Sequence, residues 1–349
     1  FLWMWRGDLE GGQQVLDRCA AAGGPPPPLL LAKAKLYEAA GRPEQAGRLL
    51  ALAAERLPDE PAVLLAAAQA AVEAGGLDEA ERLALAAERL FPRGPTVKNQ
   101  LAIVYLAQGR ADLALAKARE GLAIVPDDQS LLGWAATAAR ILGDPLHGQL
   151  IDYEAMVGVY DLETPDGWST LPAWLADLAV GLGRLHHLAE HPGTQTLHRL
   201  SGSDDPAIQA FFRAIDAPIR QHIAAMGPGE DPLRARRTGD YRLEGAWSVR
   251  LRPGGFHKDH FHAEGWLSSA FYVETPETAL DSHENQGWLR FGKPPFRTEP
   301  ELPAEHLVRP KPGRLVLFPS YMWHGTRPFG EGERMTVAFD VAVPRETAA

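Results

Sequence analysis

The stretch that decides the fold of the C-terminal part is residues 252–273, Arg-Pro-Gly-Gly-Phe-His-Lys-Asp-His-Phe-His-Ala-Glu-Gly-Trp-Leu-Ser-Ser-Ala-Phe-Tyr-Val. A Pro-Gly-Gly turn leads into three histidines, His257, His260 and His262, and alternating apolar residues follow over 266–273. Alternation with a period of two is typical of a β-strand. The sequence therefore predicts imidazoles, the commonest metal-binding side chains, at the end of a strand.

Further short strands are expected on both sides of this stretch. Apolar and polar residues alternate from Ala246, with Trp247 on one face and Arg250 on the other. More strands are expected over 288–291, 315–318 and 335–343, separated by glycine and proline. About eight short strands in a hundred residues, without a helical pattern, predict a double-sheet jelly roll.

Histidines from two distant strands are the candidates for a metal site. His260 and His262 alternate along an extended segment, so their side chains point to the same side. His324 follows some sixty residues later, and a jelly roll can bring these two strand ends together. Ten residues after His324, Arg334 begins the last expected strand, with Thr336 two positions on.

This spacing resembles that of the Fe(II)/2-oxoglutarate-dependent oxygenase superfamily, where a His-x-Asp/Glu pair and a distant histidine bind one face of the iron. The likeness covers about residues 247–343 and is closest to prolyl-hydroxylase-like oxygenases found behind tetratricopeptide repeats. It implies Fe(II) and 2-oxoglutarate as cofactors, O₂ as the oxidant, and a double-stranded β-helix fold. Arg334 and Thr336 match the Arg-x-Ser/Thr element that holds the distal carboxylate of 2-oxoglutarate, which a guanidinium can bind with two hydrogen bonds.

The sequence departs from that superfamily at the third ligand. Counted from the strand over 266–273, the family's metal histidine falls on His260 and its acidic partner on His262, so we expect the metal ligands to be His260, His262 and His324. Asp259, in the literal His-x-Asp that begins at His257, is the alternative third ligand. A site with two histidines and an open third position is a further alternative.

The remaining site residues follow from the same resemblance. We expect His260, His324 and Arg334 to be the catalytic residues, and Arg334 and Thr336 to bind the cosubstrate. Tyr272 and Arg250 are on strands near the site and are further candidates to donate hydrogen bonds to 2-oxoglutarate. Core packing and surface charge explain these two residues equally well.

The N-terminal part contains an internal repeat of 34 residues. Three residue types keep this interval: Gly7, Gly41, Gly75, Gly109 and Gly143; Pro58, Pro92 and Pro126; Ala46, Ala80 and Ala114. The windows between them are rich in Ala, Leu, Glu and Arg, which favour helices. Each unit is therefore expected to be a pair of antiparallel helices, with glycine at the turn and proline closing the second helix. The run of prolines at 25–28 is expected to be a loop between repeats.

This pattern resembles the tetratricopeptide repeat family and covers about residues 1–161. The resemblance implies a curved α-solenoid whose concave surface binds a peptide or protein substrate. The alternative role is assembly, in which the helices form a homo-oligomer or pack on the catalytic domain.

The whole chain is expected to be an α+β multidomain protein. Residues 1–165 form the solenoid, 166–240 a helical connector and 241–349 the jelly-roll oxygenase domain. A net charge of −10 argues against a nucleic-acid binder, and without an apolar run of eighteen residues we expect no membrane span. The single Cys19 fits a reducing compartment, so we expect a cytoplasmic protein. Because the first residue is Phe, we expect the native N-terminus, with any targeting segment, to lie upstream.

The expected function is an Fe(II)- and 2-oxoglutarate-dependent dioxygenase that hydroxylates a peptide or protein side chain recognised with help of the repeats. One alternative is a three-histidine dioxygenase that works without 2-oxoglutarate. Another is a catalytically inactive repeat scaffold.

Overall fold

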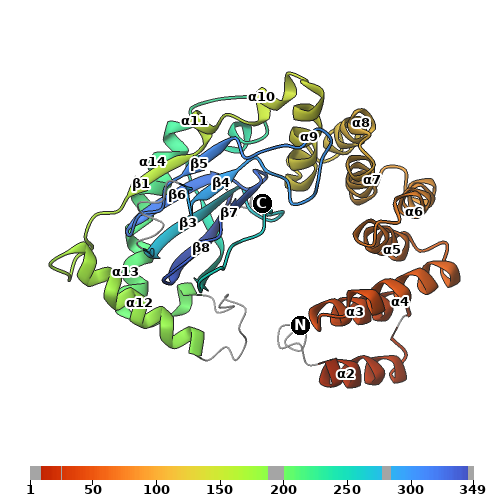
Figure 1. The fold of residues 1–349 in the computed structure, drawn as a ribbon, viewed down its shortest axis with the longest axis horizontal. Coiled ribbons are helices and arrows are strands. Elements are labelled where there is room, and N and C mark those ends of the chain that lie inside the picture. Colours follow the sequence, from red (N-terminus) through yellow and green to blue (C-terminus); the bar gives the residue numbers. More distant parts are fainter. Residues whose placement is uncertain (1–8, 25, 188–199, 277–283, 345–349) are drawn as a thin grey trace, which may run out of the picture. The chain divides into compact units, whose positions relative to one another are not determined.

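The computed structural model describes residues 9–24, 26–187, 200–276 and 284–344. The chain divides into two compact units, Phe1–Pro126 and Asp127–Ala349, called here the repeat unit and the sheet unit (Figure 1). No helix among the described residues is long and apolar enough to cross a lipid bilayer.

The repeat unit consists of helices that pack in sequence order. They are α2 (Leu9–Ala21), α3 (Pro26–Ala39), α4 (Pro43–Arg56), α5 (Pro61–Glu73), α6 (Leu77–Leu90), α7 (Pro95–Ala107) and α8 (Ala111–Leu122). Neighbouring helices form pairs, α3 with α4, α5 with α6 and α7 with α8. The predicted helical repeats are confirmed.

The repeated residues have the structural roles that the period indicated. Gly41, Gly75 and Gly109 have φ between +70° and +80° at the turn inside each pair, a conformation that glycine adopts without steric cost. The alanines at positions 46, 80 and 114 are almost fully buried and allow the helices to approach closely. The prediction of a loop over residues 25–28 is wrong for residues 26–28, because α3 begins at Pro26. Proline suits the first turn of a helix.

The sheet unit begins with helices and continues into two antiparallel sheets. Its helices are α9 (Gln129–Leu142), α10 (Leu146–Leu150), α11 (Tyr153–Met156), α12 (Leu171–His187), α13 (Pro206–Ala214) and α14 (Asp216–Ala225). Its strands are β1 (Gly158–Asp161), β2 (Arg242–Leu251), β3 (Leu267–Glu274), β4 (Leu289–Phe291), β5 (His306–Val308), β6 (Arg314–Pro319), β7 (His324–Thr326) and β8 (Arg334–Ala342).

The two sheets face each other. One has the strand order β1-β6-β3-β8-β2, and the other has the order β5-β4-β7 (Figure 1). An isolated bridge between His260 and His324 adds a further segment beside β7. The rings of Phe291 on β4 and Phe318 on β6 lie 5.0 Å apart and join the two inner faces. This is the antiparallel, double-sheet architecture that the strand pattern predicted.

Helices cover the outer face of the five-stranded sheet. Trp174 on α12 and Phe211 on α13 pack against Phe271 of β3, with ring centroids 5.8 and 5.0 Å away. Phe211 also contacts Phe339 of β8. The outward residues of β3 and β8 therefore form the core with α12 and α13, and the residues that alternate with them point into the space between the sheets.

The domain boundaries differ from the predicted ones. α9 was expected to belong to the solenoid, but its Trp134 packs on Phe261 and Trp323, and Arg140 donates a hydrogen bond of 2.7 Å to the Gly292 carbonyl. Likewise, residues 166–240 are not a separate connector, because α12 and α13 form the core of the sheet unit. The boundary lies near residue 126 instead of 165 because these helices bury their apolar faces on the sheets.

Candidate metal centre and cosubstrate pocket

Three histidines converge between the two sheets. One ring nitrogen from each of His260, His262 and His324 lies within 4.8 Å of the others. The ring centroids of His260 and His324 are 4.4 Å apart. These two residues also exchange both backbone hydrogen bonds, each 2.9 Å long, across the bridge beside β7. Residues that are far apart in sequence are thus brought together by strand pairing.

Hydrogen bonds orient all three rings in the same way. Nδ1 of His260 lies 2.8 Å from the Lys258 carbonyl, and Nδ1 of His324 lies 2.9 Å from the Met322 carbonyl. A carbonyl can only accept, so each Nδ1 carries the hydrogen and donates it. The Nε2 lone pair of each ring is then left for a metal ion, which is the arrangement that metal-binding histidines normally have.

The third ring, His262, donates to a carboxylate. Its Nδ1 lies 2.7 Å from Oδ1 of Asp340 on β8. Ser268 on β3 donates to the same oxygen at 2.8 Å and lies 3.1 Å from Nδ1 of His262. His262 therefore also has its Nε2 free for a ligand.

Burial favours the neutral form of His260 and His324. It lowers the pKa of His324 well below its usual value, and positive charge on His260 or His262 would lower it further. Burial also lowers the pKa of His260, helped by the neighbouring His262. Neutral imidazoles are the form that binds a metal.

Asp259, the alternative third ligand, is not in the histidine cluster. Its two carboxylate oxygens accept hydrogen bonds of 2.8 and 2.6 Å from the guanidinium of Arg290 on β4. The close approach of Gly325 allows this, since a Cβ there would lie 2.6 Å from Oδ1 of Asp259. Both oxygens of Asp259 are thus engaged by Arg290 and not directed to the histidine cluster.

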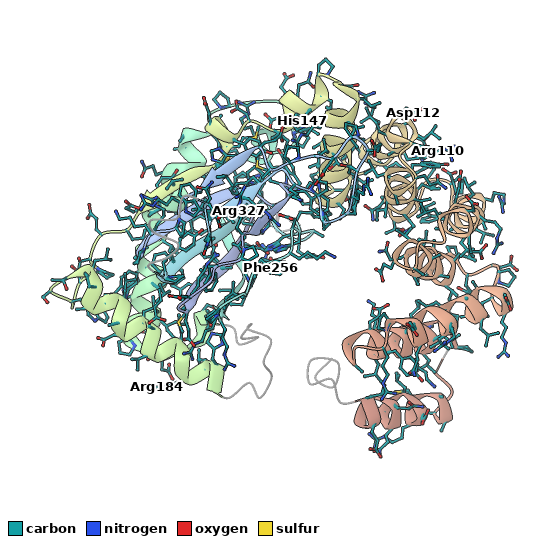
Figure 2. The ribbon with its side chains drawn as sticks, in the orientation of Figure 1. Arg110, Asp112, His147, Arg184, Phe256 and Arg327 are labelled. Atoms are coloured by element: carbon teal, nitrogen blue, oxygen red, sulfur yellow. The ribbon has the colours of Figure 1, made fainter. Side chains whose placement is uncertain are left out.

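A cavity of about 210 Å³ adjoins the histidine cluster. Its lining comes from both sheets and from the segment before His260, and includes Trp247, Phe256, His257, Lys258, Leu289, Thr326, Arg334 and Thr336 besides the three histidines. Phe256 is half exposed and is labelled in Figure 2. Burial, with repulsion from Arg334 and the neighbouring imidazoles, lowers the pKa of His257 to about 3, so this fourth imidazole is neutral as well.

Arg334 and Tyr272 carry buried polar atoms that lack partners. Arg334 is 2% exposed and donates a hydrogen bond of 3.1 Å to the Gly287 carbonyl. Its guanidinium carbon lies 5.0 Å from the ring centre of Tyr272. Among the described residues, Nε of Arg334 and the hydroxyl of Tyr272 have no hydrogen-bond partner. Buried donors in native proteins are rarely left unpaired, so this pair suits a carboxylate-bearing cosubstrate.

Thr336 and Arg250, the other residues expected to bind the cosubstrate, differ in their position relative to the cavity. Thr336 lies two positions after Arg334 on the same face of β8 and lines the cavity. Arg250 is on the opposite face of β2 from the cavity-lining Trp247 and pairs with Glu333 at the surface. Arg250, expected near the cosubstrate, does not line the cavity, because strand alternation directs its side chain away from it.

Sequence reasoning missed Asp340 and Ser268. Both were accessible to the argument from alternation, since Asp340 shares a strand face with Arg334 and Thr336, and Ser268 shares one with Tyr272. Their pairing with His262 was not accessible, because it spans 78 residues between Asp340 and His262.

A protein-family model matches part of the sheet unit. The model of the family described as "Putative 2OG-Fe(II) oxygenase" matches residues 245–340. No curated protein matches the chain.

Solved structures resemble each part of the chain. MamA of strain AMB-1 is 20% identical, with 35% of this chain and 72% of that chain covered, at a TM-score of 0.31. The viral collagen prolyl hydroxylase vCPH of Paramecium Bursaria Chlorella virus-1 is 14% identical (54% and 97% covered, TM-score 0.35). A Pseudomonas putida prolyl-4-hydroxylase is 18% identical (58% and 98% covered, TM-score 0.35). Residues 245–340 form a 2OG-Fe(II) oxygenase domain, and Fe(II) and 2-oxoglutarate are the cofactors that this family implies.

Proposed function

We propose that the protein is an Fe(II)- and 2-oxoglutarate-dependent dioxygenase that hydroxylates a peptide or protein side chain. His260, His262 and His324 would hold the iron, and Arg334 with Thr336 and Tyr272 would hold the far carboxylate of 2-oxoglutarate. The observation that carries this proposal is the shared cavity, in which three free imidazole nitrogens and a buried, incompletely bonded guanidinium face the same space.

The donor set fits both groups. Three neutral imidazoles are suitable ligands for Fe(II). The distal carboxylate of a keto acid would satisfy Nε of Arg334 and accept from the Tyr272 hydroxyl, which are the two orphaned donors. Burial of Arg334 lowers its pKa, yet a guanidinium stays protonated and therefore keeps its charge for the dicarboxylate.

When bound, iron and 2-oxoglutarate together supply the oxidising power of the reaction, with O₂ as the oxidant. The chain itself would position the metal ligands and exclude water from the cavity. The backbone hydrogen bonds between His260 and His324 set the distance between two ligands, and the three Nδ1 hydrogen bonds fix the ring orientations. Trp247 and Leu289 supply apolar lining that excludes water from the cavity.

The repeat unit is the proposed recognition element for the substrate. Helical repeats present extended surfaces that commonly bind peptides and proteins. The cavity adds a second, local element, because the half-exposed Phe256 and the exposed Lys258 belong to its lining. A peptide side chain is small enough to enter while the rest of the peptide stays outside.

A succinate assay tests the proposal. Protein reconstituted with Fe(II) is incubated with 2-oxoglutarate and O₂, and succinate is measured for wild type, His324→Ala and Asp259→Ala. We expect His324→Ala to lose both bound iron and succinate formation. Asp259→Ala should keep the iron, because Asp259 pairs with Arg290. Loss of iron in Asp259→Ala alone would refute the ligand set.

The same assay separates the alternatives. Oxygen uptake without succinate would favour a three-histidine dioxygenase independent of 2-oxoglutarate. Failure of metal-replete protein to retain iron would favour an inactive scaffold. The substrate class is tested by incubating the active enzyme with peptide libraries and searching for products that have gained one oxygen atom.

A further inference from the structure

Asp340 distinguishes His262 from the other two candidate ligands. Its Oδ1 accepts the Nδ1 hydrogen of His262 at 2.7 Å, whereas the Nδ1 hydrogens of His260 and His324 go to backbone carbonyls. Among the residues that the structure describes, His262 is therefore the one candidate ligand whose Nδ1 is hydrogen-bonded to a carboxylate.

The carboxylate is held in place by a buried network. Ser268 and Ser320 are fully buried and Asp340 is 7% exposed. Ser268 donates to Oδ1 of Asp340 at 2.8 Å, and its oxygen lies 2.9 Å from that of Ser320. Gly265 closes over the network, because a Cβ there would lie 2.3 Å from Oγ of Ser320. The contact between Asp340 and His262 is thus built into the core between β3 and β8 and is not a chance surface pair.

The negative charge of Asp340 is important because the three candidate ligands, all histidines, carry no negative charge. A set of two histidines and one carboxylate brings one negative charge to the metal, and three neutral imidazoles bring no charge. Asp340 brings the same single charge, but behind the ring of His262. A carboxylate that accepts a hydrogen bond from one nitrogen of a histidine makes the other nitrogen a stronger donor to a metal.

We propose that Asp340 is a positioning residue that compensates for the missing carboxylate ligand. It rests on the proposed function only in that His262 is taken as a metal ligand. Ser268 holds the carboxylate of Asp340 in place, and Asp340 orients the ring of His262 and increases its basicity. Nε2 of His262 would thereby be a stronger electron donor to the metal. The substitution of a histidine for the acidic ligand is thereby balanced one residue further from the metal.

The test is Co(II) titration of the metal-free protein, without 2-oxoglutarate and without turnover. We expect Asp340→Asn to weaken Co(II) binding about 10- to 100-fold, the usual effect of losing such a partner, and to alter the visible absorption of bound Co(II). Ser268→Ala, which leaves the charge in place, should give a smaller loss in the same direction. Asp259→Asn is the matched control, since this equally buried carboxylate pairs with Arg290 and not with an imidazole.

The same Asp340→Asn substitution in a His262→Asp variant tests whether Asp340 acts through the imidazole or only supports the packing of the fold. His262→Asp places a carboxylate directly at the ligand position, beside Asp340. This background lacks the imidazole that accepts the influence of Asp340, so adding Asp340→Asn there should weaken Co(II) binding less than it does in the wild-type background. If Asp340 only supported the fold, Asp340→Asn would weaken binding equally in both backgrounds.

Each outcome bears on one proposal. Wild-type affinity in Asp340→Asn, or an equal loss in both backgrounds, would overturn the role of Asp340. If Asp340→Asn does not fold, Ser268→Ala decides, and unchanged Co(II) affinity and absorption there would overturn the role. Protein that binds Co(II) normally but forms no succinate with Fe(II) would instead refute the proposed function and leave the Asp340 result valid.

Discussion

The repeat unit and the sheet unit each bury a cation, and the surroundings of the two cations are opposite. Lys98 on α7 is 6% exposed, and its Nζ lies 2.6 Å from carboxylate oxygens of both Glu88 and Glu120. Arg334 on β8 is 2% exposed, and among the described residues its Nε has no partner. The repeat unit neutralises its buried charge within the fold, and the sheet unit does not.

This difference indicates what each buried charge is for. A buried cation without a counter-charge lowers the stability of a fold, so it persists only where it has another use. In the repeat unit the ion pairs connect consecutive helices, since Glu88 is on α6, Lys98 on α7 and Glu120 on α8. In the sheet unit, we propose that the cation is kept for the anionic cosubstrate. On this proposal, polar burial supports folding in the first unit and ligand binding in the second.

The largest expected effect comes from replacing the unneutralised cation. Arg334→Met should weaken 2-oxoglutarate binding to the Mn(II)-loaded protein by about 3 kcal/mol, roughly 100-fold or more, because a buried charge pair with the ligand is lost. Calorimetric titration measures this. The same substitution should leave the free energy of unfolding of the ligand-free protein unchanged or raise it, because an unpaired buried charge is removed.

Arg334→Lys is the control for charge alone. Lysine keeps the charge but loses the planar fork, so its affinity for 2-oxoglutarate should lie between those of wild type and Arg334→Met. A large loss of stability in Arg334→Met without any change in keto-acid affinity would contradict the comparison.

Acid should destabilise the two units in different pH ranges. All twelve histidines lie beyond residue 126, and burial lowers the pKa of His257 to about 3 and that of His324 well below its usual value. In the unfolded chain these groups titrate near pH 6.5. Below that pH the unfolded state binds more protons, so stability falls as the pH falls.

We expect the unfolding free energy of the metal-free sheet unit to fall between pH 7 and pH 5, with His257 alone contributing about 2 kcal/mol. In the repeat unit, paired lysines lower the pKa of Glu88 and of Glu120, against the opposing effect of burial, so its loss should begin only below about pH 4.5. Tryptophan fluorescence follows the sheet unit, because only Trp3 and Trp5 lie outside it, and helical circular dichroism includes both units. Complete loss of the helical signal together with the fluorescence change between pH 7 and pH 5 would contradict this prediction.

A smaller effect is expected from the neutralised cation. Lys98→Met should lower the unfolding free energy of the repeat unit by about 1–2 kcal/mol, because Glu88 loses one of its two lysine partners while Lys117 remains. Chemical denaturation measured by circular dichroism tests this. Arg82→Met is the control, since its pair with Glu79 is exposed and such pairs contribute little.

The smallest effect concerns a single turn of the repeat. Gly109→Ala should destabilise the repeat unit by about 1 kcal/mol, because φ is +74° there although the space is open. Gly47→Ala, inside α4 and equally free of close neighbours, should have the opposite sign and stabilise by about 0.5–1 kcal/mol. Equal effects of the two substitutions in the same denaturation experiment would contradict the assigned turn geometry.

The repeat unit could be predicted almost completely because its contacts are local. A helix in such an array packs on its sequence neighbours, so the period of Gly75 and Gly109 already indicates the helix pairs and their turns. The period does not indicate where the array ends. Gly143 keeps the 34-residue spacing and has φ of +65°, but α9, which it terminates, packs on the sheets.

In the sheet unit, the sequence predicted which residues gather but not how they pair. His260, His324 and Arg334 follow from strand ends and spacing, and alternation alone would have rejected Arg250. The pairs between Asp340 and His262 and between Asp259 and Arg290 join a strand to the irregular segment before β3, and the local pattern cannot align the two. A one-residue change of register would reverse each of these contacts.

The reciprocal backbone pairing of His260 and His324 has a consequence for metal selection. Because main-chain hydrogen bonds fix the gap between these two rings, the gap exists before any ion enters. In the proposed metal site, a bound ion therefore meets two imidazoles whose main chains are already joined by a β-bridge. The backbone would thus contribute to the choice among divalent ions, together with the ligand type.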